Sequence, residues 1–395
     1  MNLSLRTSAL ILSLAFLIFP MESQAGNIPT VKVALALGAN QIKLSSPKQL
    51  HLSLSGGKRL LLPRTAFIRP IGEGFLVNGK QIEASRIIIK NRGGNLRVLI
   101  QEGTIGTQSR QWVVKGDIIL TLQGSRMLVV NTINLEKYVA GVVGSEISPE
   151  WHEEVLKTQA VAARTYVLHK QLLNEQSRYD VVASTQDQVY TGSEQVNHSV
   201  QRAVDATRGQ VLTYERRPIF AAYSSTAAGP TEDAFNVWSR DIPYLKGVDC
   251  PFDEGSPRYQ WKTAIPFGSF EQSLRDEGLV MGAMATLTPY TFTRAGRVNE
   301  IRILHSKGEL IVRGQDLRRI FGYSKIRSTQ FHIESIGQEV VFTGKGAGHA
   351  VGLCQWGAKE MAELGYRYES ILQYYYPGTD LLPYNRVLMS PIPPS

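Results

Sequence analysis

The pattern of hydrophobic residues changes near residue 131, and that change most limits how the chain can fold. Before it, in residues 30–130, short stretches of alternating apolar and polar side chains follow one another, for example at 31–35 and 85–89. Gly-Gly and Asn-Gly pairs separate these stretches, as is typical of hairpin turns. We therefore predict a β-rich N-terminal module over residues 30–130.

The first long helix is expected over residues 149–173. Ser148 can accept hydrogen bonds from the free N–H groups of a helix start, and Pro149 suits the first helical position. Apolar side chains then recur at spacings of four and seven residues, as on one face of a helix: Trp151, Val155, Ala162 and Tyr166. Two strands and two helices are expected further on, at residues 209–214, 219–223, 354–364 and 367–376.

The remaining chain divides into three parts by its composition. Residues 131–250 mix helices with strands, residues 251–340 form an inserted β-containing segment, and residues 341–385 are the C-terminal helical part. The fold class that follows is α+β: a β-rich module precedes a mixed α/β domain, which the inserted segment interrupts.

The first 25 residues have the features of a signal peptide. Arg6 precedes an apolar stretch at residues 9–20, and Ser23-Gln24-Ala25 fits the small-x-small rule for cleavage. The apolar stretch is shorter than the roughly 20 residues that span a bilayer, so we favour a cleaved signal over a retained anchor. We expect a protein exported to the periplasm or cell envelope, with no transmembrane segment in the mature chain.

The net charge of the chain indicates which kinds of molecule it can bind. The net charge is +9, and the basic residues are spread along the chain rather than clustered. Outside the cytoplasm the available polyanions are envelope polymers and membrane surfaces. We therefore expect general attraction to the envelope and no nucleic-acid binding.

Glu146, just before the expected helix, has two interpretations. It either complements the helix dipole, which is worth about 0.3–1 kcal/mol, or it is a general acid. The second interpretation meets a difficulty, because a helix N-terminus lowers the pKa of a carboxyl whereas an acid at neutral pH needs it raised. Burial against apolar walls would have to outweigh the dipole.

Two more groups of polar residues have open interpretations. Lys157 and Arg164 are seven residues apart and share a helix face, which is either a solvated basic face or a row of donors along a sugar-binding groove. The small polar run at 223–229 is either a turn or the site of a nucleophilic serine, although no G-x-S-x-G motif surrounds it.

The chain has two cysteines, Cys250 and Cys354. Export permits a disulfide between them. Two reduced thiols, or a metal site that also uses His349, are the alternatives. The sequence contains no C-x-x-C or H-E-x-x-H motif that would favour the metal.

Seven sequence blocks, in this order, resemble the SpoIID/LytB (stage II sporulation protein D) family: residues 135–146 (LEKYVAGVVGSE), 156–166 (LKTQAVAARTY), 187–192 (DQVYTG), 223–226 (YSST), 237–245 (VWSRDIPYL), 348–358 (GHAVGLCQWGA) and 375–379 (YYPGT). The chain departs from the expected family pattern in three places. Ile147-Ser148-Pro149 replaces methionine-proline, Ala350 replaces a glycine, and Cys354 replaces a serine.

The resemblance implies a function in peptidoglycan remodelling. Some members of the family are lytic transglycosylases that act on glycan strands without stem peptides, and others are described as enhancers of a cell-wall amidase. It implies that Glu146 is the catalytic glutamate of a mixed α/β catalytic domain. It places Lys157 and Arg164 where the family contacts glycan. The other residues expected in substrate binding are Tyr190, Tyr223, Ser224, Ser225, His349 and Gln355, of which the two tyrosines either stack on sugar faces or belong to the core.

The expected partners are therefore peptidoglycan glycan strands and, in the alternative, an amidase. The resemblance implies no cofactor. Some relatives bind a structural zinc ion through clustered His and Cys residues, and because this chain has no such cluster in its sequence we expect no metal.

Overall fold

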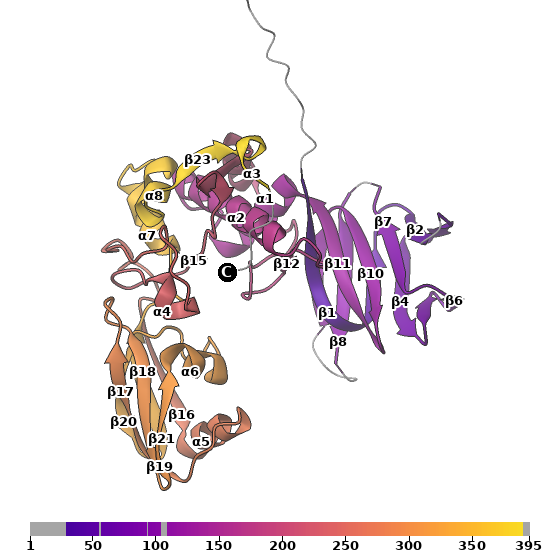
Figure 1. Cartoon of the computed structure of the whole chain (residues 1–395). Coiled ribbons are helices and arrows are strands. Elements are labelled where there is room, and N and C mark those ends of the chain that lie inside the picture. Colours follow the sequence, from indigo (N-terminus) through magenta and orange to yellow (C-terminus); the bar gives the residue numbers. More distant parts are fainter. Residues whose placement is uncertain (1–28, 55–56, 93, 104–108, 390–395) are drawn as a thin grey trace, which may run out of the picture.

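The computed structural model describes residues 29–54, 57–92, 94–103 and 109–389 (Figure 1). The signal peptide expected at residues 1–25 lies outside the described residues. The structure is mixed α/β, with a curled β-rich sheet at its N-terminal end and helices that follow it. No helix in the described part of the chain combines the length and the hydropathy that a membrane crossing requires.

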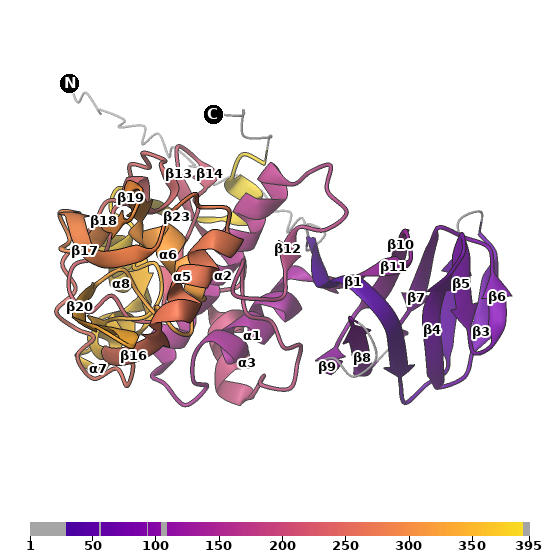
Figure 2. The ribbon, with the colours of Figure 1, turned by 90° about the horizontal axis from the view of Figure 1, so that it is seen from below.

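The N-terminal sheet is organised around its long first strand, β1 (Thr30–Ser45). One half of β1 pairs with β11 (Arg126–Asn134), and the other half pairs with β4 (Thr65–Ile71) on one edge and β8 (Leu96–Glu102) on the other. The sheet therefore splits and curls, as Figure 2 shows. Its other strands are β2 (Leu50–Leu54), β3 (Arg59–Leu62), β5 (Gly74–Val77), β6 (Lys80–Ile82), β7 (Arg86–Lys90), β9 (Ser109–Val114), β10 (Asp117–Gln123) and, by parallel pairing with β1, β12 (Val181–Val182).

Two helices follow β11 directly. α1 (Leu135–Glu146) begins at its N-cap Asn134, whose side chain accepts from the N–H groups of Glu136 and Lys137. α2 (Glu153–Leu173) begins at its N-cap His152. The expectation of one helix from residue 149 is thus wrong in two ways: α2 starts four residues later, and α1 precedes it.

The physical reasons are local. Ser148 does not cap a helix: its carbonyl accepts from the N–H of Trp151 (3.1 Å) in a turn between the two helices. α1 contains three valines and two glycines, residue types of low helix propensity. Packing supplies what propensity lacks, because nine of the twelve residues of α1 are buried.

The chain then forms short elements that return to α2. They are α3 (His198–Ala206), β13 (Gln210–Tyr214), β14 (Arg217–Pro218), β15 (Tyr223–Ser224), α4 (Ala234–Trp238), β22 (Leu353–Cys354), α7 (Gln355–Glu363), α8 (Tyr368–Tyr375), β23 (Asp380–Pro383) and the 3₁₀ turn η1 (Tyr384–Arg386). The strand expected at 209–214 is confirmed as β13, and the two expected C-terminal helices as α7 and α8. The strand expected at 219–223 is wrong, because β15 only begins at its last residue.

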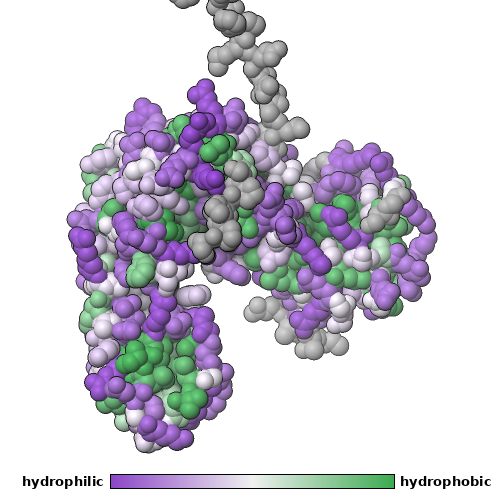
Figure 3. Space-filling model, in the orientation of Figure 1, coloured by the Kyte–Doolittle hydropathy of each residue, from purple (hydrophilic) through white to green (hydrophobic). Residues whose placement is uncertain are grey.

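The inserted segment has a hydrophobic core of its own, in which the rings of Phe270 and Phe321 stack with centroids 4.3 Å apart. It lies on the far side of the helices from the β-rich sheet (Figure 1), and hydrophobic side chains gather on its visible face (Figure 3). Its elements are β16 (Gln260–Pro266), α5 (Phe267–Asp276), β17 (Met284–Phe292), β18 (Val298–His305), β19 (Gly308–Arg313), α6 (Gly314–Phe321), β20 (Phe331–Ile336) and β21 (Glu339–Lys345).

The domain boundaries drawn from the sequence stay a prediction. The boundaries after residues 130 and 340 fall inside β11 and β21, so each would cut a strand. The N-terminal sheet and the helices also share one continuous hydrophobic core, which includes Val33 and Ile42 of β1 together with Leu156 of α2.

Candidate functional site

Glu146 is the last residue of α1, and three distant parts of the chain reach its partly buried carboxyl group. Its Oε1 accepts a hydrogen bond from the backbone N–H of Val189 (2.7 Å) and one from the hydroxyl of Tyr223 (3.2 Å). The side chain of Gln355, the first residue of α7, is a third hydrogen-bond partner. The structure thus brings together three of the residues that the sequence placed in the site.

A buried polar chain fixes the direction of the Tyr223 hydroxyl. The hydroxyl of Tyr138 donates to Gln188 Oε1 (3.0 Å), and Gln188 Nε2 donates to the hydroxyl oxygen of Tyr223 (2.9 Å). Because that oxygen accepts from Gln188, its own hydrogen is free to point at Glu146. Tyr223 is therefore oriented as a donor toward the carboxyl.

Burial raises the pKa of Glu146 above its ordinary value. The hydrogen bonds from Val189, Tyr223 and Gln355 act in the opposite direction and are smaller in effect. Within the described part of the chain no cationic side chain forms an ion pair with Glu146. The carboxyl is therefore biased toward its protonated form.

The helix dipole does not oppose this bias. The difficulty anticipated from the sequence assumed that Glu146 precedes a helix, whereas it ends one, and the C-terminal end of a helix carries partial negative charge. That charge disfavours a carboxylate. α2 begins only at Glu153.

Two glycines of α1 allow the Val189 segment to approach Glu146. A Cβ atom on Gly141 would lie 2.6 Å from the carbonyl oxygen of Gly192, and one on Gly144 would lie 2.5 Å from that of Gln195. Only glycine permits such contacts between a helix and a neighbouring backbone. Gly141 and Gly144, although poor helix formers, therefore allow the segment that carries the Val189 N–H to lie against α1.

His349 is part of the framework behind Tyr223. Its Nδ1 accepts from the N–H of Val351 (3.0 Å), its ring is also hydrogen-bonded to the backbone of Tyr223, and it packs against Trp238 with ring centroids 5.0 Å apart. Burial, followed by the charge of Arg318, lowers its pKa to about 3. His349 is therefore neutral at physiological pH.

The two serines also hold local structure. Ser224 Oγ accepts from the N–H of Ala350 (3.1 Å), and the carbonyl of Ser225 accepts from the N–H of Trp356 (3.1 Å). Both bonds join the β15 segment to the β22 segment, which pairs with it in parallel. Ser224 is buried, and Ser225 is partly exposed.

Arg164 lies away from solvent. Its side chain is 0% exposed, and its guanidinium binds Glu136 of α1 (Nη2 to Oε2, 2.7 Å) and the carbonyl of Gln210 in β13 (3.1 Å). A side chain in this position holds α1, α2 and β13 together. It has no free surface for a ligand, which corrects the expectation that Arg164 lines a groove.

Lys157 and Tyr190 also have structural contacts. Lys157 Nζ pairs with Glu154 (2.8 Å), whose other oxygen accepts from the N–H of Tyr368 in α8 (2.8 Å). Tyr190 is 2% exposed, and its hydroxyl donates to Asn131 (3.1 Å). The structure does not bring either side chain into hydrogen-bonding contact with Glu146.

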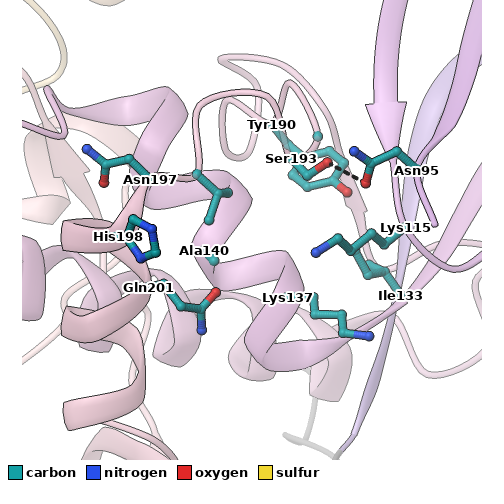
Figure 4. Close-up of a pocket in the computed structure, with 12 residues that line it drawn as sticks. Asn95, Lys115, Ile133, Lys137, Ala140, Tyr190, Ser193, Asn197, His198 and Gln201 are labelled. Atoms are coloured by element: carbon teal, nitrogen blue, oxygen red, sulfur yellow. Dashed lines mark hydrogen bonds between the residues drawn. The ribbon is translucent and has the colours of Figure 1, made fainter. Parts of the chain in front are cut away.

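The segment that carries Val189 also borders a cavity of about 400 Å³ between the β-rich sheet, α1 and α3 (Figure 4). Two lysines, Lys115 and Lys137, contribute exposed side chains to it. The other polar lining residues include Asn95, Ser193, Asn197, His198 and Gln201. This lining suits a polar or anionic ligand better than an apolar one.

The sequence left a disulfide between Cys250 and Cys354 open. In the structure both are free cysteines, and both are buried.

Sequence reasoning missed two groups that position or bind the Glu146 carboxyl: the Gln188 side chain, which donates to Tyr223, and the backbone N–H of Val189. A backbone amide has no side-chain signature, and only the glycines at 141 and 144 pointed to a close approach on α1.

Comparisons with known proteins relate two parts of the chain to family models. Residues 123–214 match the family model SpoIID, described as "Stage II sporulation protein", and residues 239–352 match a domain of unknown function (DUF8618). The amidase enhancer of Bacillus subtilis (strain 168) is 30% identical over 289 residues, which are 62% of this chain and 40% of that protein.

Two other relatives match this chain over a larger share of their own length. Stage II sporulation protein D of Bacillus amyloliquefaciens is 36% identical over 267 residues, which are 64% of this chain and 75% of the relative. The protein of the same name from Bacillus subtilis (strain 168) is 34% identical over the same shares. The resemblance inferred from seven sequence blocks is thus confirmed, and the chain belongs to the stage II sporulation protein D (SpoIID) family.

Proposed function

We propose that the protein remodels peptidoglycan as a lytic transglycosylase in the periplasm or cell envelope. It cleaves the bond between MurNAc and GlcNAc in glycan strands without stem peptides and leaves 1,6-anhydro ends. The observation that carries the proposal is the carboxyl of Glu146, which has a pKa raised by burial, no cationic partner among the described residues, and donors from three segments.

In this mechanism protonated Glu146 gives its proton to the glycosidic oxygen as the bond to C1 breaks. The 6-hydroxyl of the same MurNAc then attacks C1, and the Glu146 carboxylate accepts the hydroxyl proton. The proton that leaves Glu146 is thus replaced, and no water enters. A second carboxylate, which ordinary glycosidases need to activate water or to attack C1, is not required.

The surroundings of Glu146 suit both halves of this cycle. Burial favours the protonated acid before the reaction. Once the proton has left, Val189 N–H and Tyr223 O–H stabilise the carboxylate, and donors already in place for a developing charge are an efficient form of catalysis. Glu146 is therefore the catalytic residue of this proposal, and Tyr223 binds it directly.

A nearby acidic residue is suited to a different role. Asp187 Oδ1 pairs with Lys170 (2.9 Å) and accepts from the hydroxyl of Tyr166 (2.9 Å), and its Oδ2 accepts from the N–H of Val182 (2.8 Å). These contacts make Asp187 a support for the chain segment leading to Val189. Glu146 therefore acts alone as acid and base.

A second candidate function is non-catalytic: glycan binding that recruits or stimulates an amidase. The relative named an amidase enhancer favours it. Binding does not need a proton donor, so the two functions differ in whether Glu146 is essential.

The test is digestion of purified glycan strands, with and without stem peptides, with products identified by mass spectrometry. The proteins compared are the mature chain, Glu146→Gln and the control Glu150→Gln, which changes an exposed carboxyl four residues further on. The enzyme proposal expects anhydro-ended fragments from the mature chain and Glu150→Gln only. Strand binding by all three proteins without any fragments would replace it with the amidase-partner function.

A further inference from the structure

Three side chains that take no part in the proposed reaction meet inside the protein. Cys250 and Asp253 come from one segment and Cys354 from another, and 101 residues separate Asp253 from Cys354. Their exposed fractions are 2%, 1% and 1%. One ligand atom from each, the two sulfurs and a carboxylate oxygen, lies within 4.8 Å of the others.

The Asp253 carboxylate is only half satisfied. Its Oδ2 accepts from the N–H of Ala228 (2.7 Å) and from the thiol of Cys354 (3.1 Å). Its Oδ1 is buried and has no hydrogen-bond partner among the residues that the structure describes. Buried polar atoms in native proteins are almost always paired, so an unpaired carboxylate oxygen beside two thiols calls for a partner.

We propose that Cys250, Asp253 and Cys354 form a binding site for a thiophilic divalent metal ion of the zinc type. Two sulfurs and a carboxylate oxygen are ligand types that zinc prefers, and three protein ligands with a water molecule complete a tetrahedral set. The metal would pair the Asp253 oxygen, and the two thiols would release their protons to solvent on binding.

Hydrogen-bonding groups lie close to both sulfurs. Cys354 Sγ accepts from the N–H groups of Ala227 (3.3 Å) and Gly357 (3.4 Å) and caps the N-terminus of α7, whose partial positive charge favours an anion. The hydroxyl of Tyr375 lies 3.2 Å from Cys250 Sγ. Such hydrogen bonds from outside the ligand set typically orient and tune metal ligands.

A disulfide is the competing use of the two cysteines. It would join the sulfurs but leave the Asp253 oxygen without a partner, whereas a metal uses all three groups. The absence of a close-spaced motif led to the expectation of no metal. That expectation considered ligands close together in the sequence, and here the fold supplies the third ligand from far along the chain.

The site would also stabilise the arrangement around Glu146. Gln355, which hydrogen-bonds Glu146, directly follows Cys354 in the chain. A metal on Cys354 fixes the start of α7 and therefore the position of Gln355. This structural role does not depend on whether Glu146 catalyses glycan cleavage.

The experiment uses the mature protein, purified under reducing conditions, incubated with Zn²⁺ and dialysed. Zinc is measured by elemental mass spectrometry, and free thiols by intact mass with and without a thiol-alkylating reagent. The variants are Cys354→Ser and Asp253→Asn, and Asp249→Asn is the control because it changes an exposed neighbouring carboxyl. We expect one zinc per chain in the wild type and the control, and a loss of at least tenfold in affinity in both site variants.

Absorption of the Co²⁺-loaded wild type provides a readout that does not require a folded variant, because thiolate-to-metal charge-transfer bands appear only with sulfur ligands. Two outcomes would overturn the proposal. One is protein that binds no zinc after reduction and that, when purified without reductant, is lighter by two hydrogen atoms and resists alkylation, as a disulfide predicts. The other is equal zinc in the wild type, Cys354→Ser and Asp253→Asn.

Discussion

Helix α1 carries a glutamate near each end, and the two carboxyls have opposite surroundings. Glu136, in the first turn, is 4% exposed and forms a buried ion pair with Arg164. Glu146, in the last turn, is bound only by uncharged donors in the described part of the chain. The same residue type on the same helix thus pairs with a cation at one end and with neutral donors at the other.

The difference shows that burial alone does not decide what a carboxyl does. A buried carboxyl paired with a guanidinium strengthens the structure only while both partners are present. A buried carboxyl with neutral donors favours the protonated form, and the negative end of the helix adds to that preference. The charge of the group that binds the carboxyl therefore distinguishes the two ends of α1, and variants that change this charge test the comparison.

The largest effect is expected when Glu146 is given the kind of partner that Glu136 has. Gln355→Lys places an amine beside the carboxyl, stabilises the carboxylate and lowers the pKa of Glu146. Glycan cleavage at neutral pH should fall by about 10²–10⁴-fold, the usual contribution of a general acid, and should partly recover at lower pH. The measurement is the initial rate of anhydro-product formation from about pH 3 to pH 8, a range that spans the ordinary titration of carboxyl groups near pH 4 and a raised one above it.

Gln355→Met is the matched control, because it keeps the size of the side chain without a charge. It should lose no more activity than the removal of one donor to Glu146 costs, roughly 10²-fold, and lowering the pH should not restore that activity. Equal losses in the lysine and methionine variants would show that Gln355 itself, and not the charge beside Glu146, limits the reaction.

The reverse change is made at the other end of α1. Arg164→Met leaves the Glu136 carboxylate buried without its partner, and breaking one side of a buried ion pair costs about 3–5 kcal/mol. Thermal unfolding followed by circular dichroism should show a large loss of stability. Adding Glu136→Gln to Arg164→Met should restore part of it, and a double variant no more stable than the single one contradicts the pairing.

Tyr223→Phe tests a neutral donor on Glu146. Removing the hydroxyl takes away one of the bonds that lower the pKa of Glu146, so the protonated acid persists to higher pH. The alkaline limb of the pH–rate profile should shift upward, while the maximal rate falls by roughly 10²-fold, as for the loss of a donor to a developing charge. A downward shift of that limb would exclude Tyr223 as a donor to the carboxyl.

Glu146 itself should weaken the folded state at neutral pH. Its pKa is raised in the folded protein, so the folded state binds more protons, and stability falls as the pH rises through the folded pKa. Glu146→Gln should therefore raise the melting temperature near pH 7 and have little effect near pH 4, where the ordinary carboxyl is largely protonated as well. Melting curves at the two pH values measure the difference, and a loss of stability at pH 7 contradicts the sign.

The smallest effect is expected at Lys157. Its pairs with Glu153 and Glu154 are partly exposed, and such pairs contribute about 0.2–1 kcal/mol. Lys157→Met should lower stability by no more than this and leave binding of glycan strands unchanged. A binding assay by sedimentation with strands tests the second part, and a clear loss of binding would restore the glycan-contacting role that the resemblance implied.

How much the sequence could predict depended on the kind of signal. The motif around Glu146 and the helix that contains Arg164 were recognisable because their side chains are characteristic. α1 was not, since Gly141 and Gly144 weaken helix propensity and their purpose appears only when the Val189 segment lies against them. The ion pair of Arg164 was equally hidden, because Glu136 lies 28 residues away and nothing local connects the two.

The path of the inserted segment has a consequence for how such a protein can vary. Its first strand, β16, and its last, β21, pair antiparallel, and Gln260 lies directly opposite Lys345. The chain thus departs and re-enters at neighbouring points, between the tyrosine and the glutamine that bind Glu146. A part attached through adjacent ends can be exchanged, enlarged or removed with little change to its host. The segment is therefore the natural place for relatives to diversify while keeping the same chemistry.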